Sequence, residues 1–173
     1  MACNPPIMLA GIVNDSITDG PGIRLTLFTQ GCPHHCPGCH NPQTWAFEGG
    51  TAVSVEEILQ QIRRNPLLKG VTFSGGEPLA QAEALLPLAG QIRQLGLELA
   101  IYTGYTFEQL LDEQNPAVMQ LLSLADTLID GPFILAQRNL ELNFRGSANQ
   151  RIINLPKSLA AGQAVIETNE RWY

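Results

Sequence analysis

Short apolar segments alternate with longer amphipathic segments along most of the chain. The apolar segments are rich in β-branched and aromatic residues, which favour strands. They cover residues 23–30, 70–74, 97–103 and 127–130. A polar, glycine-rich turn over residues 15–22 precedes the first of them. The pattern predicts four strands, each followed by a loop.

The amphipathic segments between these strands carry helix signals. Ser54 followed by Glu57 forms a capping box, and Asn115 precedes a proline that suits the first position of a helix. Thr106 with Gln109 starts a shorter helix. Apolar side chains recur at helical spacing in the three longer segments: Val55, Ile58, Leu59 and Ile62; Leu85, Leu86, Leu88, Ala89, Ile92 and Leu95; Val118, Leu121, Leu122 and Leu124. We therefore expect four helices, and no element is assigned to the last 20 residues.

Strands that alternate with helices predict an α/β fold with a parallel sheet and outer helices, because parallel neighbours need a crossover connection. A closed eight-unit barrel takes about 250 residues. The 173 residues of this chain, 45% of them hydrophobic, therefore fit an incomplete (β/α) barrel and a single domain over residues 1–173. Ligand sites in such folds lie at the C-terminal ends of the strands, so we expect the four loops that follow the strands to meet at one site.

The loop after the first strand carries the clearest candidate chemistry. Residues 31–41, GCPHHCPGCHN, contain three of the four cysteines and all three histidines of the chain. Cys32, Cys36 and Cys39 follow a C-x3-C-x2-C spacing. Thiolates favour zinc or iron–sulfur over calcium or magnesium. Three thiolates around a four-iron cluster would leave one iron open to an external ligand.

Two other interpretations of this loop remain open on spacing alone. One is a zinc site in which the three cysteines are joined by His34, His35 or His40. The other is a loop of free thiols without a metal. Cys3 stands apart from the loop and is interpreted as an incidental thiol.

The loop after the second strand reads Gly75-Gly76-Glu77-Pro78. Glycine lacks a Cβ atom, so the backbone of Gly75 and Gly76 can approach a ligand closely. The carboxylate of Glu77 could accept hydrogen bonds from an ammonium group. By itself this stretch is as typical of a strand-to-helix turn as of a site, and its place after the cysteine loop favours a site.

The net charge of −6 argues against a general binder of nucleic acid or of anionic membranes, which would need a basic field. No apolar run approaches the ~18 residues that a membrane span needs. Small molecules and proteins are the expected partners. Three cysteines in one short loop suit the reducing cytoplasm better than a disulfide framework.

Six stretches together resemble the activating proteins of anaerobic ribonucleotide reductase, which are glycyl-radical enzyme activases of the radical S-adenosylmethionine (SAM) superfamily. The stretches are SITDGPGIR, GCPHHCPGCHNPQTW, VTFSGGEPL, YTGYTFEQL, IDGPFI and LNFRGSANQRIIN. They cover most of residues 12–155. One departure is Gly38, which stands where many radical SAM proteins have an aromatic residue. Activases of the reductase commonly carry this glycine, so the departure narrows the family.

The resemblance implies a set of cofactor contacts. Cys32, Cys36 and Cys39 would bind a [4Fe-4S] cluster whose open iron binds SAM. The methionyl amine of SAM would meet Gly75, Gly76 and Glu77. The adenine would meet backbone groups of Gly38 and His40.

The resemblance also implies an oxidoreductase mechanism. Reduced flavodoxin or a similar donor would supply one electron, and SAM would be cleaved to methionine and a 5′-deoxyadenosyl radical. That radical would abstract hydrogen from a glycine of the reductase large subunit. No catalytic side chain beyond the cluster and SAM is implied.

Three alternatives to this function remain. The chain could act on another glycyl-radical enzyme or on a small molecule such as a deazapurine precursor, or it could be a zinc-binding module without enzymatic activity. Asp130, at the end of the fourth strand, is interpreted either as a turn residue in solvent or as the floor of the site. The basic residues that follow it are interpreted either as a solvated face or as a docking surface for the reductase: Arg138, Arg145, Arg151 and Lys157.

Overall fold

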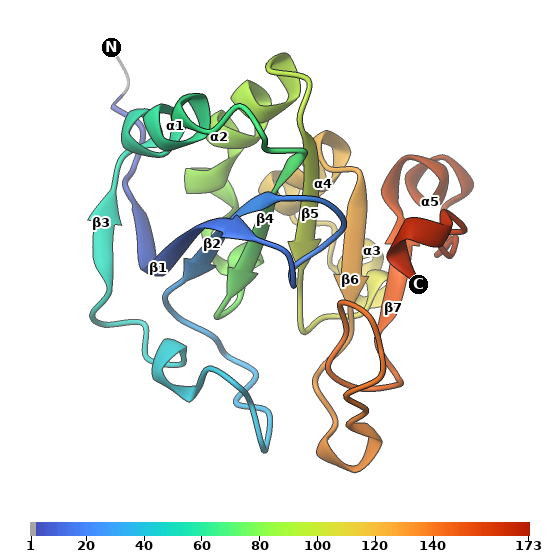
Figure 1. Ribbon diagram of the computed structural model, residues 1–173. Coiled ribbons are helices and arrows are strands. Elements are labelled where there is room, and N and C mark those ends of the chain that lie inside the picture. The colour runs from blue at the N-terminus through green and yellow to red at the C-terminus, as the bar shows by residue number, and fades with distance from the viewer. Residues whose placement is uncertain (1–2) are drawn as a thin grey trace.

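The computed structural model describes residues 3–173 and contains one seven-stranded sheet with the order β3-β1-β2-β4-β5-β6-β7 (Figure 1). The strands are β1 (Ile7–Ser16), β2 (Arg24–Thr29), β3 (Thr51–Val53), β4 (Gly70–Gly75), β5 (Glu98–Tyr102), β6 (Thr127–Asp130) and β7 (Arg151–Asn154). The central strands β2, β4, β5 and β6 run parallel, and they are the four strands that the apolar segments predict. The α/β class and the mostly parallel sheet are therefore confirmed.

Three further strands extend the sheet at its edges. β1 pairs antiparallel with β2, and β3 pairs antiparallel with β1. At the other side β7 pairs antiparallel with β6. Within residues 3–173 the outer strands β3 and β7 do not pair with each other, so the sheet is open rather than closed into a barrel.

Three of the described helices begin directly after the residues that carry the predicted capping signals, Ser54, Thr106 and Asn115. The helices are α1 (Val55–Arg64), α2 (Ala82–Gln94), α3 (Phe107–Glu113), α4 (Pro116–Leu124) and α5 (Leu155–Ala161). At the start of α1 the Ser54 hydroxyl accepts a hydrogen bond from the Glu57 backbone N–H at 3.2 Å, and the Glu57 carboxylate accepts one from the Ser54 N–H at 2.7 Å. The same reciprocal pair joins Thr106 and Gln109 before α3. The first four helices are the predicted ones, and α5 was not predicted.

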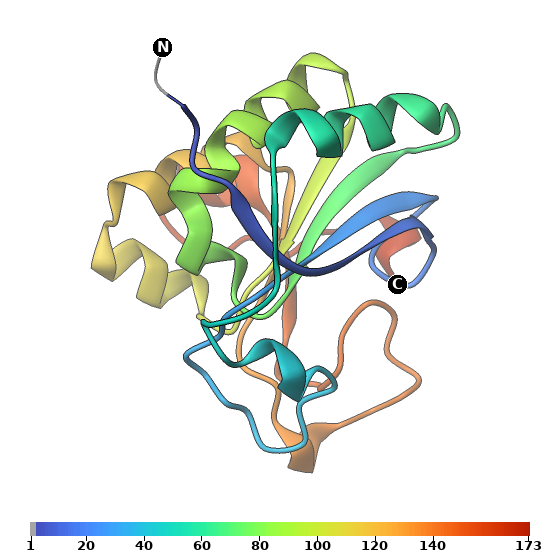
Figure 2. The ribbon, with the colours of Figure 1, turned by 90° about the vertical axis from the view of Figure 1, so that its left-hand side faces the viewer.

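The main core lies between the sheet and the helices that cover one of its faces (Figure 2). Along β5 the side chains of Leu99 and Ile101 belong to this core, whereas Ala100 and Tyr102 belong to a smaller cluster around Trp172 on the other face. This alternation is what a strand covered on both faces requires. The loops at the C-terminal ends of the parallel strands gather at one end of the molecule, below the sheet in Figures 1 and 2. None of the described helices is both long and apolar enough to cross a bilayer.

Candidate functional site

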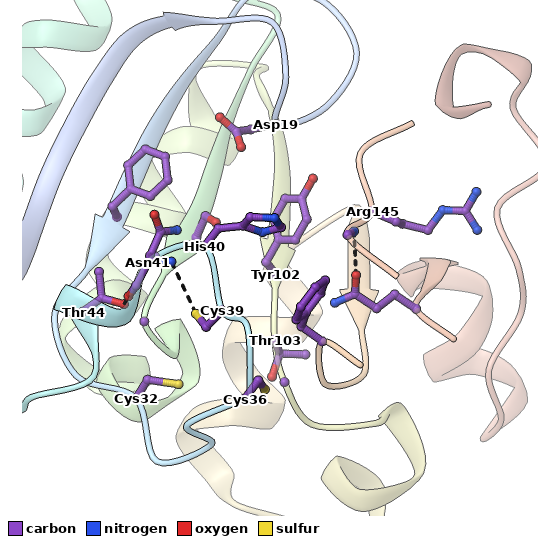
Figure 3. Close-up of a pocket in the computed structure, with 18 of the residues that line it drawn as sticks. Asp19, Cys32, Cys36, Cys39, His40, Asn41, Thr44, Tyr102, Thr103 and Arg145 are labelled. Carbon is purple, nitrogen blue, oxygen red and sulfur yellow. Dashed lines mark hydrogen bonds between the residues drawn. The ribbon is translucent and has the colours of Figure 1, made fainter. Parts of the chain in front are cut away.

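A cavity of about 640 Å³ lies at the C-terminal ends of the parallel strands, and Figure 3 shows it at close range. Its wall takes residues from all four loops that follow the predicted strands. They are the cysteine loop after β2, Gly75 and Gly76 at the end of β4, Thr103 and Gly104 after β5, and Gly131 after β6. The predicted convergence of these loops is confirmed. The volume lies in the range of pockets that hold small molecules or cofactors.

The three cysteines of the loop all line this cavity. In Figure 3 their side chains come from one continuous stretch of backbone. A hydrogen bond of 3.0 Å from the Cys39 N–H to the Cys36 carbonyl closes the turn between these two residues. The Asn41 N–H donates to the Cys39 sulfur at 3.4 Å. The Cys32 N–H donates to the Trp45 carbonyl at 3.1 Å, so the segment after the cysteine loop folds back against the first residues of that loop.

Cys32 is the most buried of the three cysteines, and burial raises the pKa of its thiol. Hydrogen bonds from the backbone of His34 and His35 act in the opposite direction on this pKa. A metal ligand must be a thiolate, and backbone N–H groups that face a sulfur stabilise its negative charge. The surroundings of Cys32 by themselves therefore favour the neutral thiol, and a bound cation would be needed to hold the thiolate.

Each histidine of the loop has a partner from another part of the chain. The Nε2 atom of His34 lies 2.7 Å from a carboxylate oxygen of Glu77. The ring of His35 stacks on Trp45 at 4.8 Å, and the ring of His40 lies 5.2 Å from that of Phe133. Across residues 3–173, no three side chains of the Cys, His, Asp and Glu types are grouped closely enough to hold a single metal ion.

The two glycines after β4 let this loop lie directly against the end of β2. The Gly76 N–H donates to the Thr29 carbonyl and the Glu77 N–H donates to the Gly31 carbonyl, both at 2.8 Å. An added Cβ at Gly75 would lie 2.3 Å from the Thr29 nitrogen, and one at Gly76 would lie 2.3 Å from the Gly31 oxygen. Gly75 also has a φ of 97°, a backbone conformation that residues other than glycine rarely adopt. Larger residues cannot replace these glycines without displacing the start of the cysteine loop.

The Glu77 side chain is fully buried and is not part of the cavity wall. Besides His34, its carboxylate accepts hydrogen bonds from the Thr103 hydroxyl at 3.0 Å, the Gly104 N–H at 2.8 Å and the Leu79 N–H at 3.1 Å. The carboxylate thus joins the cysteine loop to the ends of β4 and β5. A contact between this carboxylate and a ligand in the cavity stays a prediction.

The structure brings most of the predicted site residues to one cavity. Those in its wall are Cys32, Cys36, Cys39, His40, Gly75 and Gly76. Gly38 is not part of the wall, and its backbone, with a φ of 77°, lies beside the Leu135 side chain. Asp130 is buried outside the wall as well, where it accepts hydrogen bonds from the Phe107 N–H at 2.8 Å and from Arg151 Nε at 3.0 Å. Asp130 is therefore neither a solvated turn residue nor the floor of the cavity.

Other residues of the wall were not predicted from the sequence. They come from the turn before β2, from the end of β5 and from the segment between β6 and β7: Ile17, Thr18 and Asp19; Tyr102; Leu142, Asn143, Phe144 and Gln150. The Tyr102 hydroxyl donates to the Phe144 carbonyl at 2.7 Å, and burial raises the pKa of this phenol. These residues lie far apart in the sequence and follow no motif, so only the folded structure shows that they line the same cavity.

Comparison with known proteins identifies the family. A family model described as a 4Fe-4S single cluster domain matches residues 18–153. The chain is 37% identical over 147 residues to the anaerobic ribonucleoside-triphosphate reductase-activating protein of Escherichia coli strain K12. The aligned residues are 80% of this chain and 93% of that protein. The chain belongs to this activating-protein family. The relative of the same name in Haemophilus influenzae is 36% identical over 144 residues, which are 79% of this chain and 90% of that protein.

The activating-protein family is related to other activating enzymes. The pyruvate formate-lyase-activating enzyme of Clostridium pasteurianum is 38% identical over 119 residues, which are 64% of this chain and 50% of that enzyme. Among solved structures, QueE from Escherichia coli covers 59% of this chain at 25% identity with a TM-score of 0.43, and the match spans 53% of QueE. As a member of the activating-protein family, this protein is an activating enzyme of the radical SAM type with an iron–sulfur domain.

In this member of the activating-protein family, Glu77→Ala is expected to lower the free energy of unfolding by about 1–3 kcal/mol. The substitution leaves the buried Thr103 hydroxyl and the partly buried Gly104 N–H without their acceptor, and an unpaired buried donor costs about that much. Urea unfolding of the metal-free chain measures the change. Glu83→Ala, at an exposed position of α2, is the matched control and should change the stability little. Equal stability of both variants would show that the Glu77 network is dispensable.

Proposed function

We propose that this protein activates an anaerobic ribonucleotide reductase by forming a glycyl radical in its large subunit. The observation that supports this function best is the cavity wall itself. Three cysteines and the Gly75-Gly76 backbone line one cavity, in a chain whose named relatives are activating proteins of that reductase.

We assign the [4Fe-4S] cluster to Cys32, Cys36 and Cys39. The side chains reach the cavity from three positions along one loop, as expected where each thiolate binds a different iron. His34 already has a hydrogen-bond partner in Glu77, which argues against a zinc site completed by this residue. With three protein ligands, the fourth iron stays open for SAM.

We assign the methionyl end of SAM to the backbone of Gly75 and Gly76, where the absence of Cβ atoms exposes the main chain to the cavity. Glu77 is assigned to the methionyl end of the site as well, where its carboxylate accepts hydrogen bonds from the loop after β5 and so fixes that loop beside Gly75 and Gly76. The adenine is assigned to backbone groups of His40, and of Gly38 only if the loop moves, because Gly38 lies outside the wall beside Leu135. His40 lines the cavity beside Phe133, so its ring also narrows that end of the pocket.

Cys32, Cys36 and Cys39 would hold the cluster, and Gly75 and Gly76 would hold SAM. When bound, the two cofactors would supply the radical chemistry: with one electron from reduced flavodoxin or a similar donor, SAM would be cleaved to methionine and 5′-deoxyadenosine, and the hydrogen atom that 5′-deoxyadenosine gains would come from the target glycine, leaving its glycyl radical. The protein binds and orients both cofactors and keeps water away from the cavity. No side chain of the wall needs to act as an acid or a base.

The proposal is tested by anaerobic reconstitution with iron, sulfide, a reductant and SAM. We expect a brown protein that forms 5′-deoxyadenosine and, with the reductase large subunit, a glycyl radical detected by electron paramagnetic resonance. Formation of 5′-deoxyadenosine without a radical in the reductase would favour another glycyl-radical enzyme or a small-molecule substrate. A colourless zinc protein without affinity for SAM would contradict the proposal entirely.

We further propose that the protein acts as one domain in the cytoplasm, with protein and small-molecule partners and without nucleic acid or membrane. The net charge of −6 is unfavourable for binding to polyanions. Thiols that must stay reduced to hold a cluster suit a reducing compartment.

We propose that the segment between β6 and β7 docks the reductase. Arg138 is exposed on it, and Arg145 lines the cavity with its guanidinium carbon 5.5 Å from the centre of the Tyr173 ring. Arg151 is bound to Glu108 at 2.7 Å and to Asp130, so it is engaged within the chain. The segment therefore offers two arginines at the edge of the proposed site.

The double variant Arg138→Glu, Arg145→Glu is expected to lower the glycyl-radical yield about tenfold, because charge reversal opposes a complementary partner surface. In the single variant Arg138→Glu, SAM affinity should stay near that of the wild type, because Arg138 does not line the cavity. The double variant Arg63→Glu, Arg64→Glu makes the same charge change at exposed positions of α1 and serves as the control. An unchanged radical yield in the first double variant would move the docking site elsewhere.

A further inference from the structure

Trp172 lies on the face of the sheet opposite the main core, where its side chain is 2% exposed. The segment after α5 brings this residue back to the sheet. The Glu167 N–H donates to the Ile152 carbonyl of β7 at 2.8 Å. Next to Trp172, Arg171 forms an ion pair with Glu98 of β5. These contacts attach the segment to β7 and β5 and so fix the place of the Trp172 ring.

The Trp172 ring contacts two separate parts of the chain that border the cavity. It meets the Phe144 ring edge to face, with ring centres 5.5 Å apart and an angle of 78° between the planes. An added Cβ at Gly20 would lie 3.3 Å from the same ring, so the turn before β2 also lies against it. Phe144 lines the cavity, as does Asp19 next to Gly20, whereas Trp172 itself is not part of the wall. Trp172 therefore supports both parts of the wall from behind.

Phe144 has a backbone conformation that depends on such support. Its φ of 59° lies in the left-handed region, which is unfavourable for an aromatic residue. Residues keep such a conformation where the contacts around them impose it. The Phe144 carbonyl accepts the hydrogen bond from the Tyr102 hydroxyl at 2.7 Å, and its ring packs against Trp172. These two contacts fix the Phe144 ring in the wall.

This part of the wall lies away from the first two cysteines. In Figure 3, Cys32 and Cys36 are at the lower side of the cavity, and Asp19 is at the upper side. In the proposed reaction the cluster and SAM take up the side of the cysteine loop and of the glycines at the end of β4. The side of Asp19 and Phe144 is left for the target glycine of the partner protein.

We propose that Trp172 and Tyr102 are positioning residues that hold Phe144 in the form in which the wall receives the glycine-bearing segment of the reductase. The inference rests on the proposed function, because it takes the reductase to be the partner. Glycine offers no side chain for recognition, so its segment must be placed by the shape of the wall. A wall that is already fixed lowers the cost of ordering this segment on binding. Trp172 acts through Phe144 and does not touch the reacting atoms.

The first test variant is Trp172→Leu, which keeps an apolar side chain and removes the ring contact with Phe144. We expect the reductase concentration that gives half-maximal glycyl-radical formation to rise about tenfold, with a rate at saturating reductase near that of the wild type. Electron paramagnetic resonance measures the radical. Iron content and SAM affinity should stay near wild-type values, because the proposed cofactor contacts come from other segments of the chain.

The control is Leu122→Ala. Leu122 is fully buried in the main core on the other face of the sheet. Its truncation lowers the stability of the fold and should leave the half-saturating reductase concentration unchanged. This control separates a general loss of packing from the specific effect on the wall.

The second test variant is Tyr102→Phe, which removes one oxygen atom and with it the hydrogen bond to the Phe144 carbonyl. We expect a rise of about threefold in the half-saturating reductase concentration, and this variant decides the matter if Trp172→Leu does not fold. A third measurement combines Trp172→Leu with Phe144→Ala. Because Trp172 acts through Phe144, the change at Trp172 should add less than twofold to the effect of Phe144→Ala alone.

A wild-type half-saturating concentration in folded Trp172→Leu or in Tyr102→Phe would overturn the inference. A full tenfold effect of Trp172→Leu in the Phe144→Ala background would do so as well, since Trp172 would then act independently of Phe144. An equal loss of SAM affinity in Trp172→Leu would mean that Trp172 supports the whole cavity, which also contradicts the specific role. In each of these cases a wild-type chain that activates the reductase leaves the proposed function intact. A wild-type chain that forms 5′-deoxyadenosine and no radical in the reductase would overturn the proposed function and this inference together.

Discussion

Alanine at Cys32, Cys36 or Cys39 is expected to abolish the iron–sulfur chromophore and the formation of 5′-deoxyadenosine, in each case to below detection. Each thiolate is proposed to hold one iron, and all three line the same cavity. Alanine leaves an iron without a ligand at a wall that has no spare thiol. Absorbance, iron content and product formation after anaerobic reconstitution measure the effect.

The control for this experiment is Cys3→Ala. Cys3 is exposed and does not line the cavity, so its removal should leave the iron content and product formation unchanged. Any of the three loop variants that retained a full cluster would falsify the ligand assignment. A loss of iron in Cys3→Ala would show that the fourth thiol has a role that its position does not suggest.

Gly76→Val is expected to remove SAM binding and most of the cluster. A Cβ at this position would lie 2.3 Å from the Gly31 oxygen and 3.0 Å from the Thr29 oxygen. These are backbone atoms at the end of β2 and the start of the cysteine loop, so no side-chain rotation relieves the clash. Overpacking of this kind costs about 1–3 kcal/mol in a tight core. Here the displaced segment leads directly into Cys32.

Gly90→Ala is the matched control for this substitution. Gly90 lies within α2, and an added Cβ there meets no atom within 4 Å. Alanine in a helix interior is favoured over glycine by about 0.5–1 kcal/mol, so the control should be slightly more stable than the wild type. SAM binding by equilibrium dialysis and iron content compare the two variants. Normal SAM affinity in Gly76→Val would remove the glycines from the proposed cofactor site.

The strands and helices that were predicted from the sequence are those with a strong local signal. The capping box of Ser54 and Glu57 forms as the sequence predicts, because all of its atoms lie within one helical turn. The strands that were missed lie towards the edges of the sheet. β1 has irregular register between Leu9 and Gly11 and again between Val13 and Ser16, which disrupts the alternation of a regular strand. β3 is three residues long, too short for a period to be recognised, and β7 has only two apolar residues, Ile152 and Ile153, between polar ends.

The sequence by itself determined which loops would meet. In a parallel sheet the C-terminal ends of the strands lie at the same edge, so the order of strands and helices was enough to bring the cysteine loop to Gly75 and Gly76. The class of metal was likewise predictable from a short stretch of sequence, because three thiols in one loop favour a soft metal whatever surrounds them.

Only the tertiary structure decided where the side chains at this edge point. Glu77 turns away from the cavity because its acceptor oxygens meet donors of His34, Thr103 and Gly104, which come from two other loops. Trp45 has a buried N–H because the chain folds back onto Cys32 and His35 stacks on the indole ring. Such contacts depend on ångström-scale packing between segments that are distant in the sequence, and no spacing or periodicity specifies them.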